Sequence, residues 1–205
     1  MNFNYEYLNN LSTDTLKQAD PKEFILFLAH SLRLGALYKA KFFMWIENSN
    51  YEIIAQDDEE TEHLLKETLS IFKKASSETV ENNIDFMDNI FYSVLKKSGK
   101  FEEQDCISLS LCLLAFVSFK QELITNEEYL EIRDLLVPYK LMISQCKLKA
   151  EELMKLYKEE NIDQNEDIML LAKLGKGIVT KMPKDEIVNE AFKEITYDEK
   201  SWEKE

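Results

Sequence analysis

The scarcity of glycine and proline is the feature that most constrains this fold. Only four glycines and three prolines occur among 205 residues. All-β folds need many turns, which rely heavily on these two residues, so the chain is expected to consist mainly of long helices. Hydrophobic residues make up 45% of the sequence, enough for the core of a globular domain and too many for a disordered chain. We predict one mainly α domain over residues 1–195 and a charged tail over residues 196–205.

The charge is strongly acidic. With 25 basic and 39 acidic residues, the formal net charge is −14, which argues against binding to nucleic acid or to an anionic membrane surface. The first ten residues lack the basic and apolar regions of a signal peptide, and the uncharged run 106–119 is too short to span a bilayer. We therefore expect a cytoplasmic protein, with Cys106, Cys112 and Cys146 as buried thiols.

Capping signals and apolar periodicity predict about seven helices. Asp20 precedes Pro21 and is typical of a helix start, and Thr125 with Glu128 forms a capping-box pattern. The helices are expected over residues 20–45, 57–74, 84–97, 104–123, 125–138, 147–159 and 183–195. Two short apolar runs, 168–171 and 178–180, flank a segment with two glycines and predict one small β-hairpin near the C-terminus.

Taken alone, the residues indicate no particular chemistry. The chain has only two histidines, His30 and His63, and it contains no metalloprotease, Cys-x-x-Cys, phosphate-loop or nucleophile-elbow motif. The pair Gly175 and Gly177 fits a hairpin turn better than a phosphate loop, because no helix follows it directly.

The order of five segments is more informative. These are residues 3–11, Pro21–Gly35, Phe42–Asn48, 123–136 and the hairpin region 168–179. The second segment ends in Ala29-His30-Ser31-Leu32-Arg33-Leu34-Gly35, and the third reads Phe-Phe-Met-Trp-Ile-Glu-Asn. Together, over about residues 3–195, they resemble the carboxyl-terminal helical domain of 3-dehydroquinate synthase.

The resemblance implies a site between two domains. In that family a Rossmann-like first domain binds NAD, and the helical domain supplies a divalent metal, usually zinc, through one glutamate and two histidines. Lysines and arginines of the helical domain bind the anionic groups of the substrate. The resemblance covers only the helical domain, so no NAD site of this kind is expected in this chain alone.

The metal ligands that the resemblance implies are altered. His30 stands at the position of the family's glutamate, and Glu103 stands at that of the last histidine. Both histidines of the family's Gly-His-Thr-Phe-Gly-His are replaced, with Asp85 or Asp88 near the first ligand position. His30, Asp88 and Glu103 would still be an acceptable donor set for a divalent metal.

The anion-binding positions change as well. Arg33 replaces a family lysine and keeps its charge, and Lys73 resembles another. Arg33 and Lys73 are therefore the candidates for contact with a substrate anion. Glu160 and Asn161 stand where the family has two lysines, which makes phosphate binding less favourable.

Three hypotheses follow. In the first, the chain is a catalytically degenerate synthase-like domain that binds a partner protein or a second copy through the former interdomain face. In the second, it is a metal-dependent enzyme that uses the exchanged set His30, Asp88 and Glu103. In the third, it is the metal and substrate half of a split synthase. The first hypothesis is favoured, so the chain is expected not to be an enzyme and to bind no cofactor.

Overall fold

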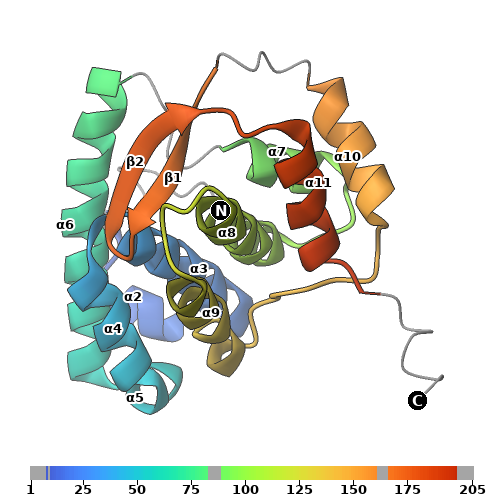
Figure 1. Cartoon of the computed structure of the whole chain (residues 1–205). Coiled ribbons are helices and arrows are strands. Elements are labelled where there is room, and N and C mark those ends of the chain that lie inside the picture. Colours follow the sequence, from blue (N-terminus) through green and yellow to red (C-terminus); the bar gives the residue numbers. More distant parts are fainter. Residues whose placement is uncertain (1–7, 9, 83–88, 161–165, 198–205) are drawn as a thin grey trace.

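The computed structural model describes residues 8, 10–82, 89–160 and 166–197, and the side chains of 78–82 are not described. This part of the chain forms ten α-helices, one 3₁₀ turn and one hairpin (Figure 1). The elements are α2 (Thr13–Gln18), α3 (Pro21–Tyr38), α4 (Ala40–Asn48), α5 (Asn50–Ile54), α6 (Asp58–Asn82), α7 (Ile90–Lys97), α8 (Glu103–Lys120), α9 (Asn126–Asp134), η1 (Val137–Tyr139), α10 (Ala150–Glu159), β1 (Asp167–Lys173), β2 (Lys176–Lys181) and α11 (Asp185–Glu194). The predicted mainly α fold with one late hairpin is confirmed.

The predicted helix starts are built as expected. The Asp20 carboxylate accepts hydrogen bonds from the backbone amides of Lys22 and Glu23. At α9 the Thr125 hydroxyl accepts from the Glu128 amide, and the Glu128 carboxylate accepts from the Thr125 amide. Each bond satisfies a donor that the first turn of a helix leaves without an intrahelical partner.

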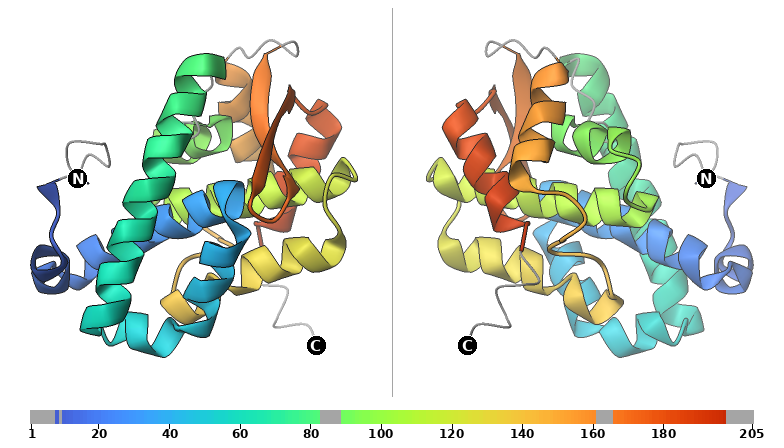
Figure 2. Two further views of the ribbon diagram at one scale, coloured as in Figure 1. Left: turned by 90° about the vertical axis from the view of Figure 1, so that its left-hand side faces the viewer. Right: turned by 90° about the vertical axis from the view of Figure 1, so that its right-hand side faces the viewer.

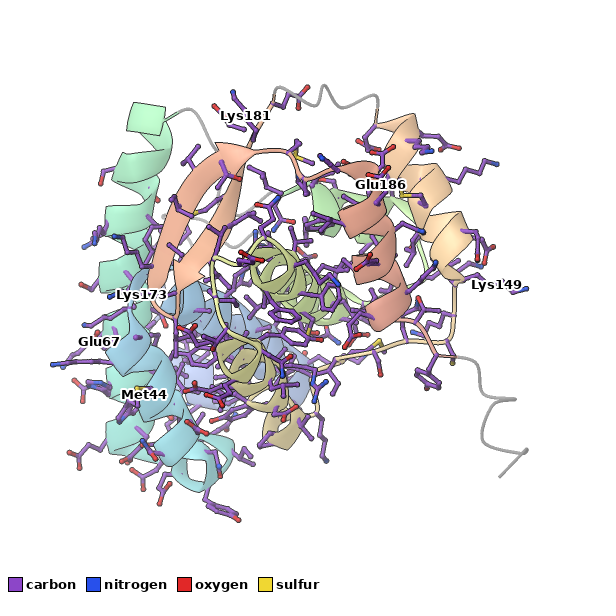
Figure 3. All side chains as sticks on the ribbon, in the orientation of Figure 1. Met44, Glu67, Lys149, Lys173, Lys181 and Glu186 are labelled. Carbon is purple, nitrogen blue, oxygen red and sulfur yellow. The ribbon has the colours of Figure 1, made fainter. Side chains whose placement is uncertain are left out.

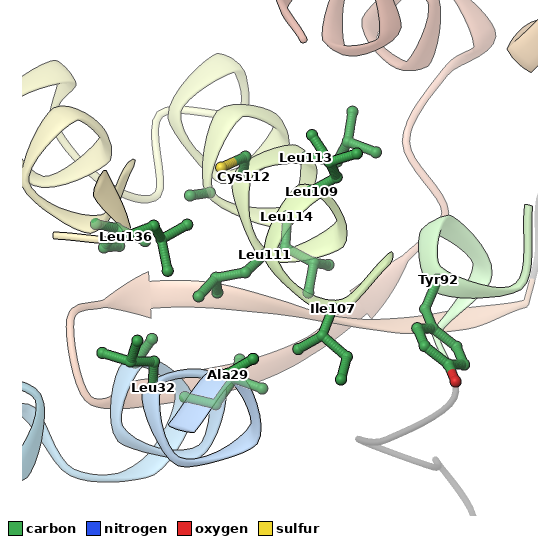
Figure 4. Close-up of a cluster of buried hydrophobic side chains, with 14 of the residues drawn as sticks. Ala29, Leu32, Tyr92, Ile107, Leu109, Leu111, Cys112, Leu113, Leu114 and Leu136 are labelled. Carbon is green, nitrogen blue, oxygen red and sulfur yellow. The ribbon is translucent and has the colours of Figure 1, made fainter. Parts of the chain in front are cut away.

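Helix α8 is the centre of the fold. Every residue from Cys106 to Ser118 is buried, and α8 packs against α3, α7, α9, α11 and β1 (Figures 1 and 4). The Ser118 hydroxyl accepts a 2.9 Å hydrogen bond from the Leu171 amide of β1. The uncharged run therefore lies in a core helix that is buried on all sides over residues 106–118.

The hairpin and α6 lie on the outside of this core. Strands β1 and β2 pair antiparallel, and Leu170 and Leu171 of β1 are fully buried. Helix α6 runs along one side of the molecule (Figure 2) and packs against α3. Thr68 of α6 donates to Ser31 of α3 over 2.8 Å, and both residues are fully buried.

Several boundaries differ from the sequence prediction. The helix expected over 20–45 is broken at Lys39, whose φ of −153° is extended, and α4 begins after it. The short helices α2 and α5 were not predicted, α6 extends to Asn82 rather than 74, and α11 begins at Asp185 rather than 183. Residues 84–88 of another predicted helix lie outside the described residues.

One cysteine prediction is wrong. Cys106 and Cys112 are buried, whereas Cys146, in the segment that connects η1 to α10, is exposed. Among the described helices, none is both long and apolar enough to cross a membrane.

Candidate functional site

His30 and Arg33 lie in the middle of α3, a helix that packs against α4, α6 and α8, and both are buried. Their exposed fractions are only 4% and 1%. Burial holds the pKa of His30 well below its ordinary value of 6.5, and the cation of Arg33 lowers this pKa further. Both effects disfavour a charged imidazole, so His30 is neutral at physiological pH.

Glu103 lies at the start of α8 and is already engaged. Its carboxylate accepts a 2.9 Å hydrogen bond from the Tyr92 hydroxyl of α7, and the Lys96 ammonium lies 3.9 Å from the same oxygen. Lys96 also donates to the Tyr92 hydroxyl over 3.0 Å. Burial raises the pKa of Tyr92, so the phenol stays protonated and acts as the donor to Glu103.

The acidic residues at the end of α10 are paired with α7 as well. Lys97 donates to Glu160 over 2.7 Å and lies 3.9 Å from Glu159. The hydrogen bond to Glu160 raises the pKa of Lys97. Glu160, which the resemblance aligns with a family lysine, is therefore matched by a cation from this chain.

Two predicted site residues lie outside the helices α7, α8 and α10 that carry these contacts. Lys73 is an exposed residue of α6, and Asp88 lies outside the described residues. Across the described ranges, no group of three or more His, Cys, Asp or Glu side chains is placed to hold a metal ion.

The described donors do not fit a divalent metal. The cation of Arg33 acts directly on His30, and a second positive charge beside that imidazole would be repelled. The Glu103 carboxylate already accepts from Tyr92 and faces Lys96. We therefore derive no chemical step through a metal here.

Sequence reasoning did not identify the three α7 side chains that engage these acids. Tyr92 and Lys96 are spaced i, i+4 on α7, so they share one helix face. That spacing was readable from the sequence, but their partners on α8 and α10 depend on tertiary packing.

The thiols nearby show no sign of nucleophilic activation. Burial raises the pKa of Cys106 to about 11 and that of Cys112 to about 12. Since the thiolate is the reactive form, both buried cysteines are inert near neutral pH.

The surface of the described part of the chain is also hollowed. One hollow, of about 840 Å³, lies between α10 and α11 and includes Glu159, the more distant partner of Lys97. A second, of about 520 Å³, is lined by Tyr129 and Arg133 of α9 and by Glu194 of α11. The Tyr129 hydroxyl donates to Glu194 over 2.9 Å, so these two polar groups of the second hollow are already paired with each other.

Comparison with curated proteins finds a synthase. The chain is 21% identical over 187 residues to a 3-dehydroquinate synthase from Thermoanaerobacter pseudethanolicus, and the match covers 87% of this chain and 52% of that protein. The resemblance to 3-dehydroquinate synthase is confirmed. The chain spans about half the length of this curated relative. No protein-family model matches this chain.

Solved structures show the same fold. ValA, a 2-epi-5-epi-valiolone synthase from Streptomyces hygroscopicus with NAD+ and Zn²⁺ bound, matches with a TM-score of 0.71 and 12% identity over 92% of this chain and 53% of that one. A 2-deoxy-scyllo-inosose synthase complexed with carbaglucose-6-phosphate, NAD+ and Co²⁺ matches with a TM-score of 0.74 and 13% identity over 89% of this chain and 54% of that one. The described fold is that of the carboxyl-terminal helical domain of such synthases.

Proposed function

We propose that this chain is a non-catalytic, synthase-like helical domain that acts by binding a protein partner or a second copy. The binding face would be the one that carries Glu103 and Glu160, the former interdomain face. The observation that carries the proposal is the engagement of both carboxylates by Tyr92, Lys96 and Lys97 of α7.

The engaged carboxylates stand where the resemblance implies a metal ligand and a substrate lysine. A metal would have to displace Tyr92 and Lys96 from Glu103, and a substrate phosphate would meet Glu160 in place of a cation. Arg33 keeps its charge but is 1% exposed, so it reaches no solvent-borne anion unless α3 moves. These features support loss of the metal-dependent reaction.

The decisive test measures metal content and mass together. The protein is purified without a chelator, its zinc and cobalt are determined by elemental analysis, and its mass is measured by light scattering over a range of concentrations. We expect far less than one ion per chain and a mass above that of the 24.1 kDa chain. Stoichiometric metal that is lost in His30→Ala would contradict the proposal and support the exchanged metal site.

A thermal-shift titration with Zn²⁺ and Co²⁺ gives a second readout. These are the ions in the two structural neighbours. An ion that binds only the folded chain raises the melting temperature with concentration. We expect no such rise in the wild type, and a rise that His30→Ala abolishes would contradict the proposal.

A split synthase is the second candidate, because the match covers about half of each relative. Mixing this chain with a separately expressed NAD-binding synthase domain tests it. Synthase activity that appears only in the mixture would establish the split enzyme and refute a purely binding role.

A further inference from the structure

The tip of the β1–β2 hairpin is fixed onto the junction between α3 and α4. The Gly175 amide donates a 2.7 Å hydrogen bond to the Ala36 carbonyl oxygen. A Cβ atom built at Gly175 would stand only 2.0 Å from the Ala40 nitrogen. Because the two backbones are this close, residues beside the tip hold defined positions relative to the first turn of α4.

Positive charge gathers at this junction. Lys173 and Lys176 are paired directly opposite each other at the tip, and Lys39 and Lys41 flank the first residue of α4. We call these four residues the lysine surface. Lys39 pairs with Glu67, whereas no carboxylate of the described residues lies within ion-pair distance of the other three, all of which are exposed.

The fold's own electrostatics disfavour these positions. Like charges directly opposite on paired strands repel each other, and cations at a helix N-terminus oppose the helix dipole. The first turn of α4 contains no acidic residue that would compensate. A chain with 39 acidic residues has ample countercharge elsewhere, so its absence at Lys41, Lys173 and Lys176 points to a countercharge supplied from outside.

Exposed apolar side chains adjoin the lysines. Met44 follows Lys41 by three residues on the same face of α4 and is 46% exposed. Ile178, two residues after Lys176 on β2, is 39% exposed. Figure 3 shows Lys173 and Met44 at the same edge of the molecule. A partner that covers this region therefore gains apolar contact as well as ion pairs.

This surface is separate from the proposed binding face. Figure 1 shows the hairpin tip beside α4, on the other side of the molecule from α10, at whose end Glu160 lies. The inference therefore stands independently of the proposed function.

We propose that the lysine surface binds an acidic segment of a partner protein that also carries apolar side chains. The segment's carboxylates pair with Lys41, Lys173 and Lys176, and its apolar side chains cover Met44 and Ile178. An extended polyanion such as nucleic acid is a poorer occupant, because the surrounding net charge of −14 repels it.

The test uses a short fluorescein-labelled peptide of alternating glutamate and leucine, whose binding to the full chain is followed by fluorescence anisotropy. The variant combines Lys41→Gln, Lys173→Gln and Lys176→Gln. We expect it to weaken binding by about tenfold or more, since three ion pairs are removed. Binding to the wild type should also weaken as NaCl is added.

The matched control combines Lys22→Gln, Lys155→Gln and Lys193→Gln. These three lysines are exposed on α3, α10 and α11, and none of these helices carries a residue of the lysine surface. The control changes the net charge by the same amount and should leave peptide binding unchanged. An equal loss in both variants would show a general charge effect and overturn the proposal.

Two further readouts complete the test. Because the lysines oppose one another and the helix dipole, the lysine-surface variant should melt at a higher temperature than the wild type, whereas the control should not. If it melts no higher, the argument from unfavourable placement fails. If inorganic phosphate displaces the peptide more than NaCl of equal ionic strength does, the lysine surface is a small-anion site and the peptide partner is overturned. Absence of peptide binding to the wild type would also overturn the proposal.

Discussion

Replacement of Gly175 by alanine tests the docking of the hairpin most directly. Gly175 has a φ of +76°, in the left-handed region that favours glycine. A Cβ there would lie 2.0 Å from the Ala40 nitrogen and 2.7 Å from the Ala40 Cα. Both contacts involve backbone, so the hairpin tip must retreat, and the Gly175 hydrogen bond to Ala36 is lost with it.

The expected cost is the sum of three effects. A left-handed backbone costs a non-glycine residue about 1 kcal/mol, overpacking against fixed neighbours costs about 1–3 kcal/mol, and a lost hydrogen bond costs about 1 kcal/mol. Gly175→Ala should therefore lower the free energy of unfolding by about 3–5 kcal/mol, a large share of the about 5–15 kcal/mol that stabilises a typical protein.

Gly99→Ala is the matched control, and urea denaturation is the assay. Gly99 also has a left-handed φ, +64°, but a Cβ there would meet nothing within 4 Å. It should therefore cost only the backbone term of about 1 kcal/mol. If Gly175→Ala costs no more than Gly99→Ala, the close approach of the hairpin tip to α4 is not a real feature of the fold.

Three other changes have defined outcomes. Ser118→Ala leaves the buried Leu171 amide without its acceptor and should cost about 1–3 kcal/mol in urea denaturation; an unchanged midpoint would contradict this. Thr125→Ala removes the cap that pairs with Glu128 and should cost about 1 kcal/mol, which Thr125→Ser should largely restore in a thermal melt. The pKa of His30 is lower in the folded chain than the ordinary 6.5, so the unfolded chain takes up a proton first as the pH falls. The contribution of neutral His30 to the free energy of unfolding is therefore complete above the ordinary pKa of 6.5, and it is lost progressively as the pH falls below that value. Urea unfolding at about pH 7.5 and 5.5 should show a smaller decrease for His30→Phe than for the wild type, and equal decreases would refute the assignment.

Much of the architecture was predictable because its causes are local. The caps at Asp20 and Thr125 depend on side chains within three residues of the amides that they bind. The run 106–119 contains no charged residue, and this alone indicates a helix buried on all sides. The hairpin followed from two short apolar runs around a glycine-containing turn.

The candidate site was predictable only in part. The resemblance assigned positions to His30, Arg33 and Glu103, but not their surroundings. That Tyr92 and Lys96 engage Glu103, and that Lys97 engages Glu160, follows from the packing of α7 against α8 and α10. A residue's type does not reveal which distant side chain will face it.

The sequence by itself thus determined most of the longer helical segments and where the hairpin forms, because periodicity and capping act over a few residues. Only the tertiary structure decided the break between α3 and α4, which lies where Gly175 meets Ala36 and Ala40. It also brought the lysines of α4 and the hairpin tip together despite a net charge of −14. Both depend on contacts between segments more than a hundred residues apart, which no local pattern encodes.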